Sequence, residues 1–484
     1  MSSIKKDTIV FGVTQIAERV VSFLLITVLA KSVSQDEFAI WSQSVVVSGF
    51  ATPVLLLGFQ TALIKYMHRF EDEPAKWHSL LFAMLTGIAF TMVALVLTMT
   101  LFPAGYSWLI FGNPKYVVYI QPLVAMIVSE SLMEFMVGLL RAGGKIRKIS
   151  YYLFVKSLFR MGVFCAAVYL NSFSFYWAFL SFTIVQLGFV GYLYLRYLPF
   201  GKMFVTGLSA ARDMWREVLT YALPLVPLAL VTALNSFAGR FFLANMHGLE
   251  EVAGYSASFS IAALIASVYS ILGFTVFPEL SRRYAGGDMD AVRDLVGQAV
   301  VVYLFLLIPF IFGLALVGPD ILLLMTTANY NVPWYILMMQ GVSVGLFGGY
   351  QILFYVTLLG RGSMNGLYVM SFSAVMNLLF DIVLIPKYSS LGVVVATCLS
   401  NALLLILTLF IARKIIPMRV QWSYSLRIVL RSVIMLLLLW GGLALFGNGN
   451  RYVLVISVAA AAVLYFIMDL LDSGYSIIKL LKRQ

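Results

Sequence analysis

Residues 8–30 read TIVFGVTQIAERVVSFLLITVLA, an apolar stretch that carries two charged residues, Glu18 and Arg19, near its middle. A helix of about 20 mostly apolar residues crosses the roughly 30 Å hydrocarbon core of a bilayer. The stretch is too long for the apolar part of a signal peptide, and no small-residue cleavage site follows it, so we expect it to stay in the mature protein. It therefore predicts a transmembrane helix that holds two charges within the membrane.

The same pattern continues along the whole chain. Of the 484 residues, 62% are hydrophobic and 11% are charged, whereas a soluble domain has about 25% charged residues. The sequence therefore predicts an all-α integral membrane protein with about fourteen transmembrane helices joined by short polar segments. These helices are expected to begin near Thr8, Phe38, Leu80, Val117, Tyr151, Phe173, Val218, Ala253, Val292, Tyr335, Leu367, Val393, Leu426 and Tyr452.

The basic residues that give the net charge of +12 are distributed as the predicted topology requires. The joints on the side of the N-terminus collect most Lys and Arg residues, Arg431 among them, and the opposite joints collect only Lys31, Lys115, Lys387 and Arg451. Cytoplasmic loops of membrane proteins carry such an excess of positive charge. We therefore expect a multi-pass protein with both termini in the cytoplasm, and the basic balance does not indicate nucleic-acid binding.

The chain contains an internal repeat. Residues 38–42 (FAIWS) resemble residues 252–256 (VAGYS), each after an acidic pair, and Leu-Gly-Phe recurs at 57–59 and 272–274 farther along the same predicted helices. Many transporters place their substrate site between two such repeated bundles. The predicted organisation is a six-helix lobe (1–199), a surface linker on the cytoplasmic side (200–217), a second six-helix lobe (218–416) and two further transmembrane helices with a cytoplasmic tail (417–484).

Polar residues form a stripe on the first predicted helix. Gln15, Glu18, Arg19 and Ser22 follow helical spacing. Arg19 would lie about 16 Å from the cytoplasmic end at 1.5 Å per residue, which is close to the middle of the membrane. Charges at this depth are costly and usually face a partner or a water-filled cavity. The stripe therefore either lines a substrate cavity, or Glu18 or a neighbouring helix neutralises Arg19 and the stripe only fixes helix packing.

Four further charges lie on two consecutive predicted helices. Glu130 and Glu134 are one turn apart, as are Lys156 and Arg160, and the short joint at 141–150 closes the two helices into a hairpin. Residues equally far from the turn lie at equal depth, so Glu130 should face Arg160 and Glu134 should face Lys156. These pairs are either static salt bridges or gating elements in which a carboxylate takes up a proton when its partner moves away.

The second half of the chain carries two more polar stripes. Asn235 and Arg240 share one stripe, and Arg240 near the outer end either contacts substrate or extends to the membrane interface. Asn377 and Asp381 share another, which also ends near the outer face. From depth alone, Asp381 could pair with Arg240.

Motifs for enzymes and cofactors are missing from the sequence. There is no phosphate-binding Gly-Lys-Ser/Thr motif, no HExxH and no metal-spaced cluster of His or carboxylates. The two cysteines, Cys165 and Cys398, both fall within predicted spans. We therefore expect no enzyme activity, cofactor or metal, and transport would draw on an ion gradient, the membrane potential or the substrate gradient.

Two stretches resemble a known family. Residues 377–388 (NLLFDIVLIPKY), with LGVVVAT at 391–397, are similar to the pattern N-x-x-L-[ND]-x-x-L-I-P-x-x-G-x-x-G-A-A-x-A-T of polysaccharide-transport (Wzx-type) flippases. These flippases belong to the multidrug/oligosaccharidyl-lipid/polysaccharide exporter (MOP) superfamily. The chain departs from the pattern in lacking the first loop glycine and in having Val393-Val394 in place of Ala-Ala. Residues 234–240 (LNSFAGR), with GLEEVAGYS at 248–256, also resemble the family, which commonly has Asp-Arg where this chain has Gly239-Arg240.

The resemblance implies a MATE-like, V-shaped pair of lobes that alternates access. Such a protein would move undecaprenyl-pyrophosphate-linked oligosaccharide, an O-antigen, capsule or exopolysaccharide unit, across the bacterial inner membrane. A pyrophosphate head group needs cations in the cavity. The candidate substrate-binding residues are Arg19, Glu18, Gln15, Arg240 and Asn235. The candidates for gating or ion coupling are Glu130, Glu134, Lys156, Arg160, Asp381 and Asn377.

The expected partners are lipid-linked oligosaccharide, membrane lipid and a coupling ion, H⁺ or Na⁺. A polymerase or other glycan-assembly proteins could join them. Two alternatives remain open from the sequence: a cation-coupled multidrug exporter of the MATE type, whose cavity should be net acidic, and a membrane scaffold of a glycan-synthesis complex that transports nothing.

Overall fold

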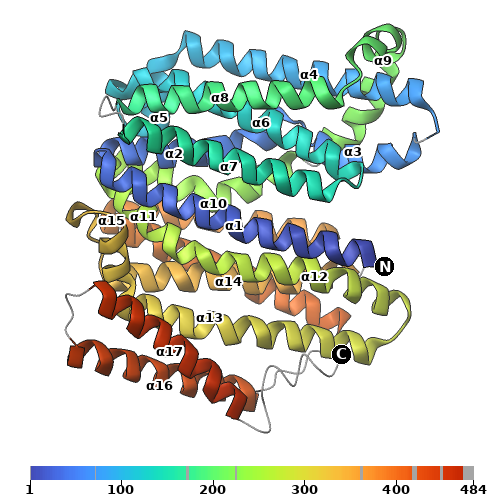
Figure 1. Ribbon diagram of the computed structural model, residues 1–484. Helices are drawn as coiled ribbons and strands as arrows, with labels where there is room; N and C mark the ends of the chain where they lie inside the picture. The colour runs from blue at the N-terminus through green and yellow to red at the C-terminus, as the bar shows by residue number, and fades with distance from the viewer. Residues whose placement is uncertain are drawn as a thin grey trace. The chain divides into compact units, whose positions relative to one another are not determined.

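The computed structural model describes residues 2–70, 72–169, 174–223, 226–359, 363–416, 422–446 and 451–471. Every regular element in these ranges is a helix, and no strand occurs within them (Figure 1). Eleven stretches of the described residues are long and apolar enough to cross a membrane, and the one at Gly366–Ile415 covers two of the predicted spans. The all-α membrane fold expected from the sequence is therefore confirmed.

The chain forms two compact units, of which the first is Met1–Ala253. Its helices follow the predicted spans, with short additional helices between them. They are α1 (Ser2–Ser32), α2 (Gln35–Leu55), α3 (Phe59–Arg69), α4 (Pro74–Leu101), α5 (Pro103–Phe111), η1 (Pro114–Tyr119), α6 (Ile120–Ala142), α7 (Ile146–Tyr169), α8 (Phe175–Tyr197), α9 (Phe200–Ala222) and α10 (Val226–His247).

The second predicted span is broken between α2 and α3. We expected residues 57–59 to continue the helix, but Leu57 and Gly58 both have positive φ angles, 49° and 73°. A Cβ atom on Gly58 would lie 2.6 Å from the carbonyl oxygen of Ala222, so only glycine fits this left-handed position. Because the chain turns here, α3 starts a new helix beside α6. The expectation of one continuous helix was wrong, because the apolar pattern continues through Leu57 and Gly58, where the backbone turns.

The predicted linker forms helix α9, which packs on α4 and α3. Trp215 donates a hydrogen bond from Nε1 to Oγ1 of Thr86 at 3.2 Å. Near its C-terminal end, Glu217 accepts a hydrogen bond from Tyr66 Oη at its backbone oxygen and forms an ion pair with Arg69. These contacts attach the linker helix to the first unit.

The second unit, Gly254–Gln484, contains the remaining helices. Ser389 has φ 50° and ψ −129° and divides α15 into two segments, as the spans predicted near Leu367 and Val393 require. The helices are α11 (Leu249–Ala262), which begins in the first unit, η3 (Ala263–Ile265), α12 (Ala266–Ala285), α13 (Met289–Met325), η4 (Ala328–Tyr330), α14 (Trp334–Leu359), α15 (Ser363–Ile415), α16 (Trp422–Phe446) and α17 (Arg451–Leu471).

The last two helices, α16 and α17, pack on α13. Tyr465 donates a hydrogen bond to the backbone oxygen of Phe305 at 2.9 Å and packs on its ring. Arg431 was expected among the charges of the loops, but it is only 7% exposed and pairs with Asp469 at 2.6 Å. The two helices are therefore joined by a buried ion pair as well as by apolar packing.

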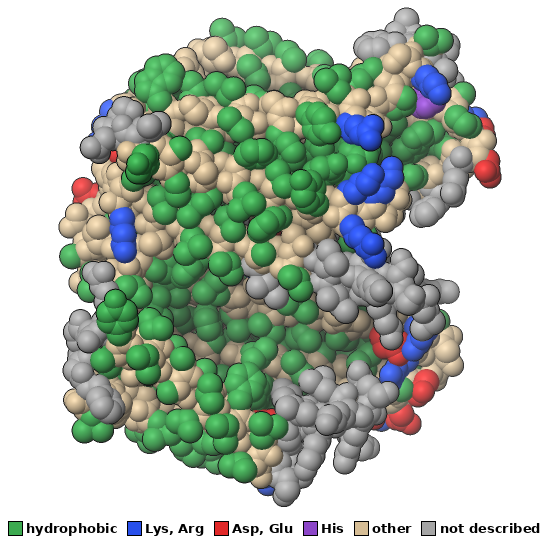
Figure 2. Space-filling view, viewed as in Figure 1, with side chains coloured by type: hydrophobic (Ala, Val, Ile, Leu, Met, Phe, Trp, Pro, Cys, Tyr) green, Lys and Arg blue, Asp and Glu red, His purple; other side chains and the backbone are tan. Residues whose placement is uncertain are grey.

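Apolar side chains cover much of the surface. In the upper part of Figure 2, hydrophobic side chains spread over the helices, and Lys and Arg side chains gather at the right-hand end, where α3 and α9 lie in Figure 1. Apolar groups on this scale are expected where helices face lipid. The concentration of cations at one end agrees with the charge pattern along the sequence.

Candidate functional site

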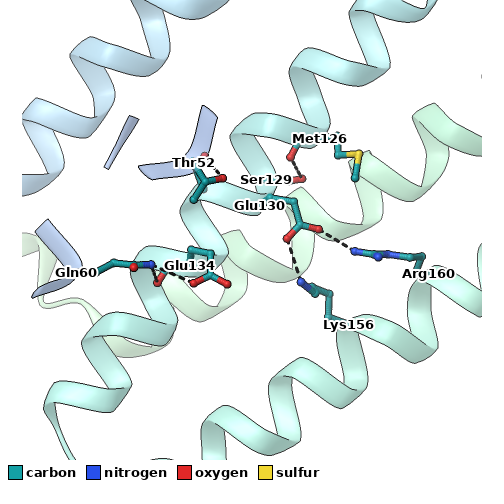
Figure 3. A network of polar contacts seen from close by, with 9 residues as sticks. Thr52, Gln60, Met126, Ser129, Glu130, Glu134, Lys156 and Arg160 are labelled. Carbon is teal, nitrogen blue, oxygen red and sulfur yellow. Dashed lines mark hydrogen bonds and ion pairs between the residues drawn. The ribbon is translucent and has the colours of Figure 1, made fainter. Parts of the chain in front are cut away.

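Glu130 is the centre of a buried ion cluster in the first unit. From α7, Lys156 Nζ lies 3.0 Å from one carboxylate oxygen and Arg160 lies 2.8 Å from the other (Figure 3). The three side chains are only 10–16% exposed. The predicted pairing of Glu130 with Arg160 is therefore confirmed, and one carboxylate satisfies two cations.

The predicted pairing of Glu134 with Lys156 was wrong. The side chain of Lys156, on α7, binds Glu130 instead, which lies one helical turn before Glu134 on α6. Glu134 is held by Gln60 of α3, whose Nε2 atom lies 3.0 Å from its Oε2 atom and 3.0 Å from its backbone oxygen. The prediction failed because the helix break at Leu57 and Gly58 places Gln60 over Glu134, a contact outside the hairpin.

Helix α1 adds a further carboxylate to the cluster. It packs along α7, and the charges of Lys156, Arg160 and Glu130 all act on Glu18. Arg19 is half-buried, and no hydrogen bond to it is found among the described side chains. The Gln15 side chain lies outside those that the structure describes. The structure therefore brings Glu18 to the hairpin charges, which were predicted as a separate group.

An aromatic wall supports the cluster. The guanidinium of Arg160 lies 5.8 Å from the ring of Trp41 and 5.1 Å from the ring of Phe182. Trp41 itself makes edge contacts with Phe164, Phe179 and Phe182. Cation–π contacts of this kind stabilise a guanidinium while leaving its N–H groups for hydrogen bonds. The packing thus directs Arg160 toward Glu130.

A cavity of about 380 Å³, lined by both polar and apolar residues, lies beside the cluster, between α2, α3, α6 and α7. Ser48 is 3% exposed, and its hydroxyl has no hydrogen-bond partner among the described residues. Thr52 forms a hydrogen bond with Ser131 at 3.1 Å. The lining residues are Val45, Ser48, Gly49, Thr52, Pro53, Gln60, Met126, Glu130, Glu134 and Arg160.

The part of this cavity that α2 and α3 contribute was not predicted from the sequence. Isolated Ser, Thr and Gln residues in apolar helices carry no distinctive pattern. The one available signal was Leu57-Gly58, because a glycine within an apolar run can mark a break.

Helix α10 carries two of the candidate substrate-binding residues, Arg240 and Asn235. Arg240 is 9% exposed and makes polar interactions within the structure. Its backbone oxygen accepts a hydrogen bond from Gln43, which is fully buried. The Asn235 side chain lies outside the described ones. Arg240 and Asp381 belong to different units, so their pairing stays a prediction.

The second unit holds an unsatisfied polar pair on α15. Asp381 is 0% exposed and Asn377 is 2% exposed. Neither carboxylate oxygen of Asp381, nor Nδ2 of Asn377, has a hydrogen-bond partner among the described residues of this unit. A buried polar group without a hydrogen-bond partner carries a free-energy cost.

The described residues contain no group of three or more His, Cys, Asp or Glu side chains arranged to hold a metal ion. Cys165 and Cys398 are both free thiols. Neither cysteine contributes a disulfide to the fold.

The fold is that of MOP-superfamily transporters. The structure matches the lipid II flippase MurJ, solved in an inward closed conformation, with a TM-score of 0.73 and 16% sequence identity over 95% of this chain and 97% of that chain. It also matches an inward-facing multidrug resistance MATE family transporter of the MOP superfamily, with a TM-score of 0.68 and 13% identity over 82% of this chain and 94% of that one.

Sequence comparison places the chain more narrowly. Residues 4–283, more than half of the chain, match the polysaccharide biosynthesis protein family, and the chain belongs to that family. A curated relative, the probable low-salt glycan biosynthesis flippase Agl15 of Haloferax volcanii, is 22% identical over 237 residues. This alignment covers 48% of each chain, so it spans about half the length of that relative.

Proposed function

We propose that the protein is a flippase that moves undecaprenyl-pyrophosphate-linked oligosaccharide across the bacterial inner membrane by alternating access. The observation that carries the proposal is membership of the polysaccharide biosynthesis family on a transporter fold. The name of the relative Agl15, a probable glycan biosynthesis flippase, supports the same substrate class. The cargo would be a repeat unit of O-antigen, capsule or exopolysaccharide.

Arg19 is the proposed contact for the pyrophosphate. It lies on α1 near the predicted midplane, and the cations on the adjacent α7 are already bound to Glu130. A guanidinium binds phosphate oxygens in a bidentate way, which suits a charged head group in a membrane cavity. Glu18 and Gln15 would orient Arg19, and Arg240 with Asn235 would form a second contact.

Ion coupling is proposed to occur in the second unit. Asp381 and Asn377 have buried polar atoms without partners, so uptake of H⁺ or Na⁺ would remove an electrostatic cost. The cluster of Glu130, Lys156 and Arg160 would act as a gate whose ion pairs rearrange during the cycle. Coupling and gating would then lie in different units.

The predicted lobes, 1–199 and 218–416, would form the two halves of the alternating-access machine, with both termini in the cytoplasm. The linker 200–217 would connect them at the cytoplasmic surface. The two helices in 417–484 would accommodate the lipid tail, and a polymerase or another glycan-assembly protein would receive the product.

A gene deletion tests this function. Deletion should cause a lipid-linked glycan to accumulate on the cytoplasmic side, and the wild-type gene should reverse this. Arg19→Ala should fail to complement at normal expression, whereas Arg216→Ala, at an exposed position on α9, should complement. Loss of drug resistance without glycan accumulation would favour a multidrug exporter. Full activity of Arg19→Ala in a flipping assay would exclude its proposed role.

A further inference from the structure

The carboxylate of Glu134 is held in place without being neutralised. The Nε2 atom of Gln60 donates a hydrogen bond to Oε2 of Glu134, while Oε1 accepts no hydrogen bond from the described residues. The neighbouring cations Lys156 and Arg160 are both bound to Glu130. Glu134, whose contact with Gln60 is drawn in Figure 3, therefore has an unused acceptor atom and lines the cavity.

The hydroxyl of Ser48 is a second unused group in the same cavity. It is buried on α2, and its Oγ atom has no hydrogen-bond partner among the described residues. A hydroxyl both donates and accepts hydrogen bonds, whereas an ionised carboxylate only accepts. Buried polar atoms of this kind cost free energy unless water or a ligand satisfies them. The cavity therefore offers hydrogen-bonding groups that suit a ligand with hydroxyls.

The size of the cavity argues against a bare cation. Its volume of about 380 Å³ lies within the roughly 300–1,000 Å³ range of small-molecule sites. A dehydrated cation such as Ca²⁺ instead needs several oxygens at about 2.3–2.6 Å. A ligand of several polar groups fills this space better than one ion does.

The charge of the lining separates this cavity from a phosphate site. Arg160 of the lining is paired with Glu130, although its Nε atom has no hydrogen-bond partner among the described residues. Glu134 is the lining carboxylate that forms no ion pair among them, and a carboxylate repels pyrophosphate and accepts hydrogen bonds from hydroxyls. Val45, Pro53 and Met126 add apolar surface to the lining, and this surface can contact the C–H groups of a sugar ring.

We propose that this cavity in the first unit binds one sugar residue of the lipid-linked glycan, with Glu134 and Ser48 as the hydrogen-bonding residues. The proposal rests on the proposed function and adds a place for the sugar that is separate from the phosphate contact. Glu134 then acts in glycan selectivity and not in gating or ion coupling.

Binding of two lipids to the purified full-length protein tests the proposal. One is the lipid-linked glycan that accumulates in the deletion strain, and the other is polyprenyl pyrophosphate of the same chain length without sugar. Wild-type protein should prefer the glycosylated lipid. Glu134→Gln should weaken its binding of that lipid by about fivefold to tenfold, because an amide oxygen is a weaker acceptor than a carboxylate, and leave binding of the sugar-free lipid unchanged.

Two further variants complete the test. Ser48→Leu, which fills the cavity without changing charge, should reduce the same preference, and Glu217→Gln, on α9 outside the cavity, should not. The sugar site is refuted if Glu134→Gln and Ser48→Leu keep the wild-type preference. It is also refuted if Glu134→Gln changes only the dependence on Na⁺ or pH, equally for both lipids. Wild-type protein that binds neither lipid would refute the proposed function itself.

Discussion

The central role of Glu130 predicts a large difference between two substitutions one helical turn apart. Glu130→Gln removes the carboxylate that forms ion pairs with both Lys156 and Arg160, and both cations then remain in a site where the side chains are 10–16% exposed. Glu134→Gln leaves an amide oxygen that can still accept the hydrogen bond from Gln60. The two changes are chemically identical and conserve side-chain size.

The structure sets the expected magnitudes. Removing one partner of a buried ion pair costs about 3–5 kcal/mol, because a charge is left without compensation. Exchanging a carboxylate acceptor for an amide acceptor weakens a single hydrogen bond by about 1 kcal/mol. Glu130→Gln should therefore reduce the free energy of unfolding by about 2–4 kcal/mol more than Glu134→Gln.

Equilibrium unfolding in mixed micelles, followed by tryptophan fluorescence, measures this difference. The triple variant Glu130→Gln/Lys156→Met/Arg160→Met should recover most of the lost stability, since replacing a whole buried ion cluster by apolar residues is often neutral. Equal stability of Glu130→Gln and Glu134→Gln would refute the reasoning, as would a triple variant no more stable than Glu130→Gln.

Three other predictions follow from the fold and from the second unit. An alanine in the left-handed conformation costs about 1–2 kcal/mol. Gly58→Ala should lower the free energy of unfolding by more than this, because its Cβ would lie 2.6 Å from the Ala222 oxygen. Gly144→Ala, which is also at positive φ but in open space, should show only the conformational cost. Asp469→Asn should destabilise the α16–α17 pair by about 3–5 kcal/mol, measured by limited proteolysis, and Arg431→Met/Asp469→Met should be more stable; equal sensitivity of the two would contradict a stabilising ion pair. Asp381→Asn should bind substrate normally in a pull-down but lose the response of transport to an H⁺ or Na⁺ gradient, and a variant that still responds would exclude Asp381 from coupling.

The helical hairpins were predictable because their geometry is local. Equal depth on α6 and α7 predicted the contact of Glu130 with Arg160, which the structure contains. Arg431 and Asp469 also lie at similar distances from the connection between α16 and α17, so the same rule could have found them. They were missed because Arg431 was assigned to the loop charges and not to a helix interior.

Contacts between distant helices could not be predicted in this way. The position of Gln60 over Glu134 depends on the left-handed turn at Leu57 and Gly58, and Ala222 of α9 approaches that turn so closely that it leaves no room for a side chain at Gly58. These residues are far apart in the sequence, so their contact cannot be predicted from local periodicity. Ser48 likewise becomes notable only when α2, α3, α6 and α7 enclose a cavity around it.

Translocation in reconstituted proteoliposomes tests the proposed flippase activity most directly. The lipid-linked glycan from the deletion strain would be placed in the vesicles, and its appearance in the opposite leaflet would be followed by the access of a sugar-modifying reagent. The proposed function predicts rapid translocation with wild-type protein and only the slow background of protein-free vesicles with Arg19→Ala. Translocation by wild-type protein no faster than in protein-free vesicles, under every imposed H⁺ or Na⁺ gradient, would contradict it.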